Sequence, residues 1–473
     1  MRPVRVLLGV IAVWLTVFAG VTDSAASFTK QELTLVSADG TQLAASLYLP
    51  DGTPPSGGWP GVIFMHGLGG TRASVNTIAE AMGVVGPNYA VLSYDARGHG
   101  ASGGLVGIDG PAEIEDVKRA FAFLRDRPEV ADGKIGAWGI SYGGGAAWNS
   151  LVAGVPWAAI EVLETWTDLE EALAPQGLAK TGVIAGFLSS IDPARISPEV
   201  LAIRTAAFAG TLNGVSSFAA ARSSITKLAG VKTPVFLMQG RRDFAFGLEQ
   251  ARRAYALLEG PKRLWIGNHG HAPSTFPGAD STAMLTEGKL WFDRHLRGVQ
   301  VGLDDGRPVI VAAEGKSLVS RFAVLPPVQT LRIKLSGKNA ITPTGKVQRR
   351  TTPTRSVLEV FGAPRVKVTV TAAGGWSRIV AVLSAVTPGG REIVVAGGGT
   401  TTRAGKRTLT IRLSDQATVV PRGSRLVLTL ASSSLAQNPG NLLYLDLPMP
   451  AAARATIGDA TLTLPALARP VGT

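Results

Sequence analysis

The chain has 473 residues, enough for two or three folding units, and 45% of them are hydrophobic, so a large core can form without covalent crosslinks. It has no cysteine, which excludes disulfides, thiol catalysis, cysteine-ligated metals and a lipoprotein anchor. The net charge of +13 is concentrated at one end: from residue 299 onward there are 22 Lys and Arg against 8 Asp and Glu, whereas the preceding residues have 25 against 26.

The N-terminus has the pattern of a signal peptide. Two arginines precede an apolar run at residues 6–21, and the small residues at 24–26 suit cleavage after Ala26. We expect residues 1–26 to be removed and the protein to be exported, to the exterior or the envelope of a bacterium, because export without disulfides suits that compartment. The alternative is an uncleaved anchor, since the run is only slightly shorter than the roughly 20 residues that span a bilayer.

Residues 27–163 have the alternating strands and helices of the first part of an α/β core. A hairpin is predicted around Asp39-Gly40, and a helix beginning at Pro111 has its apolar residues on one stripe. Strands that are apolar on both faces and separated by helices indicate a mostly parallel sheet covered by helices. The strands predicted after the hairpin lie at residues 62–65, 90–94, 134–138 and 158–163.

The segment Gly139-Ile140-Ser141-Tyr142-Gly143 follows one of these strands and leads into a helix. A serine at the apex of a sharp strand-to-helix turn, with a glycine two residues to either side, is typical of a nucleophile elbow. A second match to this pattern places Ser102 among glycine-rich loop residues on both sides, so we interpret Ser102 as a turn residue. Ser141 is therefore the predicted nucleophile.

The alternation breaks at residues 164–230, which contain helical segments and no obvious strand. An insertion here would lie over the carboxyl ends of the strands, where ligands bind, so we predict a helical cap over the substrate pocket. The alternative is that these helices only complete the core. The α/β core resumes at residues 231–298 with a strand at 234–238, a last strand at 264–266 and a closing helix.

Beyond residue 305 the sequence changes character. Short β-rich runs alternate with clusters of Gly, Pro and Ser, a pattern that favours an all-β sandwich or jelly roll over residues 305–473.

A serine nucleophile needs a base, and the base needs an orienting carboxylate. Of the five histidines, His269 and His271 follow both a strand and a plausible acid, Asp243, and we favour His271. The chain order Ser141, Asp243, His271 is that of α/β-hydrolases. A His-x-His pair can also chelate zinc, but no third ligand has suitable spacing, so neither a metal nor a cofactor is predicted.

Two backbone N–H groups are the predicted oxyanion-hole donors. One belongs to Leu68, in the glycine-rich turn 66–70 that follows a strand, and the other to Tyr142, directly after the nucleophile.

Several motifs together resemble one known family. They are Asp95-Ala96-Arg97-Gly98 with Ser102-Gly103, the segment 139–143, Gln239-Gly240-Arg241-Arg242-Asp243, Gly270-His271-Ala272 and the helix from Trp291 to Gly298. In these motifs the chain resembles the X-Pro dipeptidyl-peptidase and cocaine esterase family of serine hydrolases, and the tail around residues 421–426 resembles that family's jelly-roll domain. The resemblance implies an α/β-hydrolase fold with a helical cap, followed by a C-terminal all-β jelly-roll-like domain.

The chain departs from this family at the oxyanion turn. Family members often use a tyrosine hydroxyl as the first oxyanion donor, where this chain has Leu68 and so only a backbone N–H. The peptidase members also need an acidic clamp for the amino terminus of the substrate, and the sequence identifies none. The sequence is therefore compatible with both ester and X-Pro amide substrates.

Two hypotheses for function follow. The first is an exported serine hydrolase that cleaves an ester or amide of a small molecule or peptide through an acyl-enzyme. The second is a surface-binding protein whose basic β-domain docks on anionic envelope polymers or lipids. Nucleic acid is not expected, because the basic residues have no interleaved aromatics. The acyl group, the leaving group and the oligomeric state cannot be predicted from this sequence.

Overall fold

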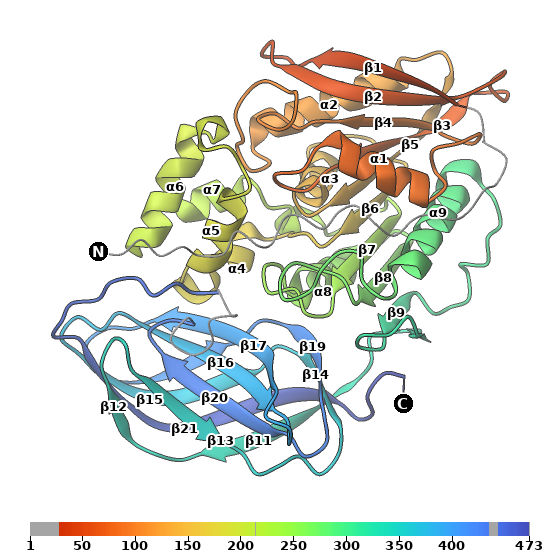
Figure 1. Cartoon of the computed structure of the whole chain (residues 1–473). Coiled ribbons are helices and arrows are strands. Elements are labelled where there is room, and N and C mark those ends of the chain that lie inside the picture. The colour runs from red at the N-terminus through yellow and green to blue at the C-terminus, as the bar shows by residue number, and fades with distance from the viewer. Residues whose placement is uncertain (1–27, 213, 435–442, 473) are drawn as a thin grey trace.

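The computed structural model describes residues 28–212, 214–434 and 443–472 (Figure 1). The predicted signal peptide, residues 1–26, lies outside the described residues. Within them, no helix is both long and apolar enough to cross a membrane.

A ten-stranded sheet forms the centre of the N-terminal α/β domain. Its strand order is β1-β2-β4-β3-β5-β6-β7-β8-β9-β10. The predicted hairpin is confirmed as the antiparallel pair β1 and β2. β2 also pairs antiparallel with β4, whereas β3 to β9 run parallel to one another. The strands are β1 (Phe28–Val36), β2 (Gln42–Pro50), β3 (Trp59–Met65), β4 (Ala90–Tyr94), β5 (Val130–Ile140), β6 (Ala159–Leu163), β7 (Val235–Gly240), β8 (Lys262–Gly267), β9 (Val309–Ala312) and β10 (Val319–Phe322).

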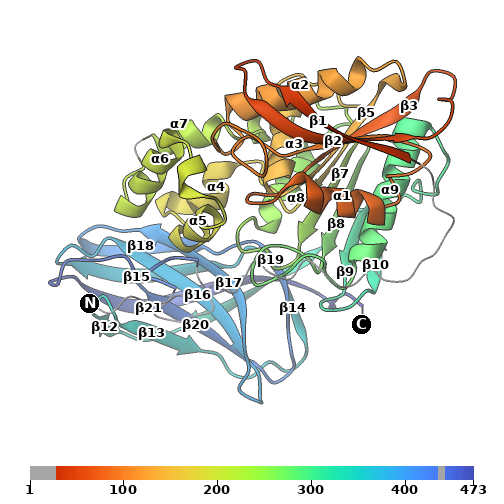
Figure 2. The same cartoon turned by 45° about the horizontal axis from the view of Figure 1, so that its top comes forward.

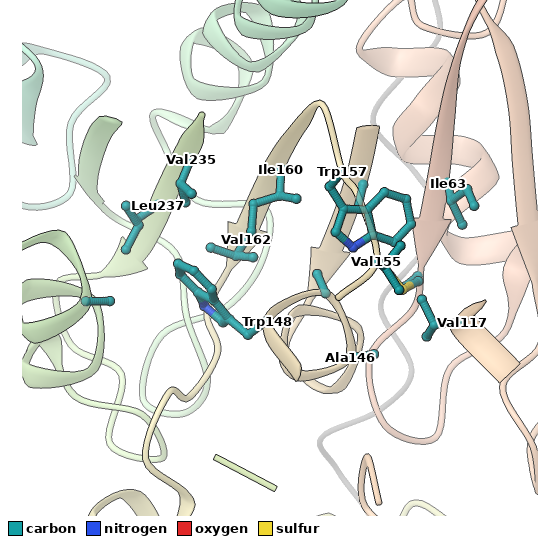
Figure 3. Packing of buried hydrophobic residues seen from close by; sticks show 14 of the residues in the cluster. Ile63, Val117, Ala146, Trp148, Val155, Trp157, Ile160, Val162, Val235 and Leu237 are labelled. Atoms are coloured by element: carbon teal, nitrogen blue, oxygen red, sulfur yellow. The ribbon is translucent and has the colours of Figure 1, made fainter. Parts of the chain in front are cut away.

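Helices cover both faces of this sheet. One face packs against α2 (Pro111–Arg125), α3 (Tyr142–Val152) and α8 (Leu248–Leu257), and the other against α1 (Arg72–Ala81) and α9 (Ser281–Arg297). The apolar stripe predicted for the helix at Pro111 is buried, as it must be to exclude water from the sheet. Figure 3 shows part of this core. The residues labelled there are Ile63, Val117, Ala146, Trp148, Val155, Trp157, Ile160, Val162, Val235 and Leu237.

The prediction that the strand at 264–266 ends the sheet is wrong. β9 pairs in parallel with β8, and β10 pairs antiparallel with β9, so residues beyond 305 extend the α/β sheet before the separate β-sheets begin at Val328. These two strands have four residues each, and their composition resembles that of the strands that follow. Amino-acid composition therefore could not assign these two strands to one sheet or the other.

The predicted helical cap is confirmed. It lies beside the α/β sheet and above the C-terminal β-sheets (Figures 1 and 2). Its helices are α4 (Leu169–Leu173), α5 (Thr181–Leu188), α6 (Pro198–Ala209) and α7 (Val215–Ala220), with 3₁₀ turns at Pro175–Gly177, Pro193–Arg195 and Ile225–Lys227.

The C-terminal domain is an antiparallel β-sandwich, as predicted, with a seven-stranded and a four-stranded sheet. Alternating inward residues of both sheets form one apolar core. The first sheet contains β11 (Val328–Leu335), β12 (Asn339–Ile341), β14 (Leu358–Gly362), β15 (Arg365–Ala373), β18 (Gly405–Arg412), β19 (Gln416–Val420) and β21 (Arg454–Leu467). The second contains β13 (Lys346–Arg350), β16 (Arg378–Val386), β17 (Glu392–Thr401) and β20 (Arg425–Ala431).

Candidate active site

Ser141 lies in a strained turn between β5 and α3. Its φ of 53° and ψ of −113° are uncommon for a non-glycine residue, which is the backbone geometry of a nucleophile elbow. The two flanking glycines permit this turn. A Cβ atom on Gly139 would lie 2.2 Å from the carbonyl oxygen of Gly143, and one on Gly143 would lie 2.1 Å from that of Met65. The turn therefore requires glycine at both positions.

The structure brings Ser141, His271 and Asp243 together. The Oγ of Ser141 lies 2.9 Å from Nε2 of His271, and Nδ1 of His271 lies 2.7 Å from Oδ2 of Asp243. Both distances are within hydrogen-bonding range. The three residues come from the ends of β5, β7 and β8, so the parallel sheet places at one edge side chains that are up to 130 residues apart in sequence.

Asp243 is fully buried, and its carboxylate is held by backbone donors. Oδ1 accepts hydrogen bonds from the N–H groups of Ala245 and Phe246, both at 2.9 Å, and Oδ2 also accepts the backbone N–H of His271 at 3.1 Å. The orientation of the carboxylate toward the imidazole is therefore fixed by the loop that follows β7.

Opposing effects set the basicity of His271. Burial lowers the pKa of the imidazole, whereas the negative charge of Asp243, its hydrogen bond and the charge of Glu164 raise it. The net result is a pKa above the ordinary value of histidine. The balance favours an imidazole that accepts a proton from Ser141 readily.

His66 organises the turn that carries Leu68. Its Nε2 accepts the backbone N–H of Ala96 at 2.9 Å, which leaves Nδ1 to donate to the carbonyl oxygen of Gly67 at 2.8 Å. Burial and the neighbouring His99 lower the pKa of His66 to about 4, so the ring is neutral and this pattern of one acceptor and one donor persists at neutral pH. Leu68 lies in the wall of the same cavity as Ser141 and Tyr142, and its oxyanion role stays a prediction.

The cap and the β-sandwich both support the loop that follows Asp243. The buried ammonium of Lys180 donates to the carbonyl oxygens of Phe244 and Ala245 at 3.0 and 3.1 Å. From the β-sandwich, the side-chain amide of Gln416 donates to the carbonyl oxygen of Asp243 at 2.8 Å. Removal of the C-terminal domain would therefore also disturb the candidate acid.

A cavity opens from Ser141 into the cap. Its wall is almost entirely apolar: apart from Ser141 and Tyr142, the polar side chains that the described residues place in it are Glu170 and Arg204. The apolar wall comes from all four cap helices and the loop after Asp243. Representative wall residues are Leu169, Leu173, Phe187, Ile203, Phe218 and Phe246.

Sequence reasoning missed Glu164, which lies beside the three predicted catalytic residues. One carboxylate oxygen of Glu164, one of Asp243 and one ring nitrogen of His271 all lie within 4.8 Å of one another. Asp243 and Nδ1 of His271 are engaged with each other, so we interpret the group as acid–base machinery. His269, the alternative base, instead points Nδ1 at Oε1 of Glu164, 2.7 Å away. A charged residue directly after an apolar strand is the signal that could have revealed Glu164.

Ser102 has a structural role in this fold. Its Oγ donates to the carbonyl oxygen of Asp95 at 2.6 Å and accepts the N–H of Ala44 at 2.9 Å, so it closes the turn after β4. This agrees with its interpretation as a turn residue.

Comparisons with known proteins indicate the family and the fold of this chain. A family model described as X-Pro dipeptidyl-peptidase (S15 family) matches residues 39–273. The quorum-quenching protein AidA of Acinetobacter baumannii is 36% identical over 88 residues, which are 18% of this chain and 29% of that protein, so the match spans less than a third of the relative.

Two solved structures share the whole architecture. A CocE/NonD family hydrolase from Staphylococcus aureus superposes with a TM-score of 0.72 at 15% identity, over 93% of this chain and 94% of that one. An α-amino acid ester hydrolase gives a TM-score of 0.70 at 15% identity, over 95% of this chain and 98% of that one. At such identities the likeness establishes the fold.

Proposed function

Because this chain belongs to the X-Pro dipeptidyl-peptidase (S15) and cocaine esterase family of serine hydrolases, we propose that it hydrolyses esters through an acyl-enzyme on Ser141. The observation that carries the proposal is the unbroken line of hydrogen bonds from Ser141 through His271 to Asp243. A serine hydroxyl becomes nucleophilic when such a base takes its proton.

The reaction follows from this geometry. The Oγ of Ser141 attacks the carbonyl carbon while Nε2 of His271 takes the hydroxyl proton. Asp243 keeps the proton of the ring on Nδ1 and stabilises the imidazolium. The N–H groups of Tyr142 and Leu68 receive the oxyanion, and the imidazolium then protonates the leaving group. Water, activated by His271, releases the acid.

The apolar cavity supports an ester with an apolar acyl group as the substrate. An alkyl or aryl acyl chain that leaves water for a wall of this kind gains about 0.8 kcal/mol per buried CH₂. The charged amino terminus of an X-Pro peptide would need an acidic partner, whereas the charged side chains that the described residues place in the wall are one acid, Glu170, and one base, Arg204. We therefore favour an esterase over a dipeptidyl-peptidase.

A substitution in the cap tests the acyl pocket. Ile203 of α6 lines the cavity, so Ile203→Trp is expected to lower kcat/KM for p-nitrophenyl octanoate at least tenfold, because the larger side chain fills space that the chain needs. Hydrolysis of p-nitrophenyl acetate should change little. Leu201→Trp is the matched control, since Leu201 lies on the same helix, is exposed and does not line the cavity. Equal losses for both esters, or in both variants, would contradict an acyl pocket in the cap.

One surface feature favours a second function, docking of the β-sandwich on an anionic envelope surface. In the exposed face of the seven-stranded sheet, Arg332 and Arg365 are both aligned with Thr463, one on each side of it. Lys334 and Lys367 flank Thr461 in the next row, about 7 Å further along the strands. Within the described part of the chain, these four cations form no salt bridge. We propose that this basic face, defined by Arg332, Lys334, Arg365 and Lys367, binds anionic lipid headgroups of the envelope after export.

Neutralising the basic face tests this second function. A variant in which all four residues of the basic face are replaced by glutamine is expected to lose salt-sensitive binding to vesicles that contain phosphatidylglycerol. Its rate of ester hydrolysis should stay normal. A charge-matched control replaces four arginines elsewhere in the sandwich. These are Arg391, Arg403, Arg422 and Arg425. Equal retention of both variants on the vesicles would remove the docking proposal.

A further inference from the structure

Two carboxylates, rather than one, lie beside the imidazole of His271. Asp243 follows β7 and Glu164 follows β6, and these strands are parallel neighbours, so their carboxyl ends meet at the same edge. One carboxylate oxygen of each residue lies within 4.8 Å of the other and of a ring nitrogen of His271. Glu164 is 3% exposed, and water therefore screens its charge poorly.

The backbone of Glu164 is held in an unfavourable conformation. Its φ of 51° is in the left-handed region, which costs a non-glycine residue of order 1–3 kcal/mol. The surroundings impose it: the N–H of Glu164 donates to the carbonyl oxygen of Met238, and the hydroxyl of Thr165 donates to the carbonyl oxygen of Ser141 at 2.7 Å. Strain of this kind persists where the neighbouring structure fixes a side chain in place. Here it aims a carboxylate at the catalytic centre.

His269 holds that carboxylate in its charged form. The ring is fully buried, Nδ1 lies 2.7 Å from Oε1 of Glu164, and Nε2 has no hydrogen-bond partner among the described residues. A neutral ring with its proton on Nδ1 donates to Glu164 and leaves only an acceptor without a partner. An imidazolium would bury both a charge and an unpaired N–H donor, which costs more. The pair of Glu164 and His269 therefore carries one negative charge.

We propose that Glu164 is a positioning residue of the triad, whose charge, held in place by His269, stabilises His271 in its protonated form while Asp243 orients the ring. This inference rests on the proposed serine hydrolase mechanism. When the Oγ of Ser141 forms its bond to the acyl carbon, the proton passes to Nε2 of His271, and the new imidazolium then faces two carboxylates. Asp243 alone would supply both the orientation and the charge in a simple triad.

Two further charged groups lie near these residues. The carboxylate of Asp280 lies beside the ring of His269 and accepts hydrogen bonds from Nε1 of Trp265 and the backbone N–H of Asn268. The ammonium of Lys180 faces the loop carbonyls of residues 244 and 245. Burial lowers the pKa of the Lys180 ammonium. Its positive charge destabilises the imidazolium of His271, whereas the charges of the two carboxylates stabilise it. The pKa of His271 is nevertheless raised, with the charge of Glu164 contributing after that of Asp243. The electrostatic balance at the imidazole thus agrees with the proposal.

The test is the pH profile of the isosteric variant Glu164→Gln. The amide oxygen can still accept the proton of His269, so the geometry is kept while the charge is lost. Loss of a negative charge makes the imidazolium less stable, and the pKa on the acid limb of kcat/KM is expected to fall by about one unit. The plateau value of kcat should fall about tenfold. An unchanged acid limb, or one shifted to higher pH, would overturn the proposal.

Glu161→Gln is the matched control. Glu161 lies on β6, the strand that Glu164 follows, and is fully buried. Neither of its carboxyl oxygens has a hydrogen-bond partner among the described residues, and burial raises its pKa well above the ordinary value, so the uncharged carboxyl is favoured and glutamine is expected to change little. Its pH profile should match that of the unmodified enzyme, and a shift as large as that of Glu164→Gln would assign the effect to general disturbance of β6. The proposed function is tested separately: an active Ser141→Ala protein would refute the mechanism itself, whereas an unshifted Glu164→Gln profile refutes only the role of Glu164.

Discussion

Replacement of Ser141 by alanine is expected to lower kcat for p-nitrophenyl ester hydrolysis about 10⁶-fold, because the variant has no group that can form the acyl-enzyme. The substitution removes one oxygen from a residue that is 9% exposed and leaves the turn intact, so the loss should appear without a loss of folding. Steady-state kinetics measures the effect, and a fluorophosphonate probe should label the unmodified enzyme and not the variant.

The second Gly-x-Ser-x-Gly serine is the natural control for this experiment. Ser102→Ala removes the hydrogen bonds to Ala44 and Asp95, which should lower the free energy of unfolding by about 1–3 kcal/mol because buried partners lose their bonds. Its kcat should stay within a few-fold of normal. Near-normal turnover by Ser141→Ala, or loss of labelling in Ser102→Ala, would contradict the assignment of the nucleophile.

Most of the fold could be predicted because local signals agreed with one another. The helix at Pro111 combined a suitable first residue with one apolar stripe, and the two strands before it, β3 and β4, are buried on both faces. β9 and β10 were assigned to the wrong sheet because strand pairing is a tertiary property. The composition of a four-residue strand such as Val309–Ala312 is compatible with either sheet.

Some residues of the candidate site could likewise be predicted from sequence motifs, whereas others depend on tertiary contacts. Ser141 was separated from Ser102 by the strand before it and the helix after it, and the order of nucleophile, acid and base limited the histidines to His269 and His271. Glu164 is a single acid with no partner near it in sequence, and its contact with His269 spans 105 residues. The apolar cavity likewise depends on how four helices fold over the sheet, which composition cannot reveal.

The substitution Asp243→Asn is expected to lower kcat about 10⁴-fold, through the tautomer of His271. The N–H groups of Ala245 and Phe246 both point at Oδ1, so the amide oxygen of asparagine should take that position and place its NH₂ group at the imidazole. The NH₂ group donates to Nδ1, which moves the ring proton to Nε2, where it faces Ser141 and blocks proton acceptance.

Glu164 does not replace the lost acid in this variant, because within the described residues its hydrogen bond is to His269 and not to His271. Kinetics of the single variant and of Asp243→Asn combined with Glu164→Gln should therefore both show the large loss, with a small further decrease in the double variant. A loss of less than about 100-fold in Asp243→Asn would mean that orientation of the imidazole does not depend on Asp243, and the acid of the triad would have to be reassigned.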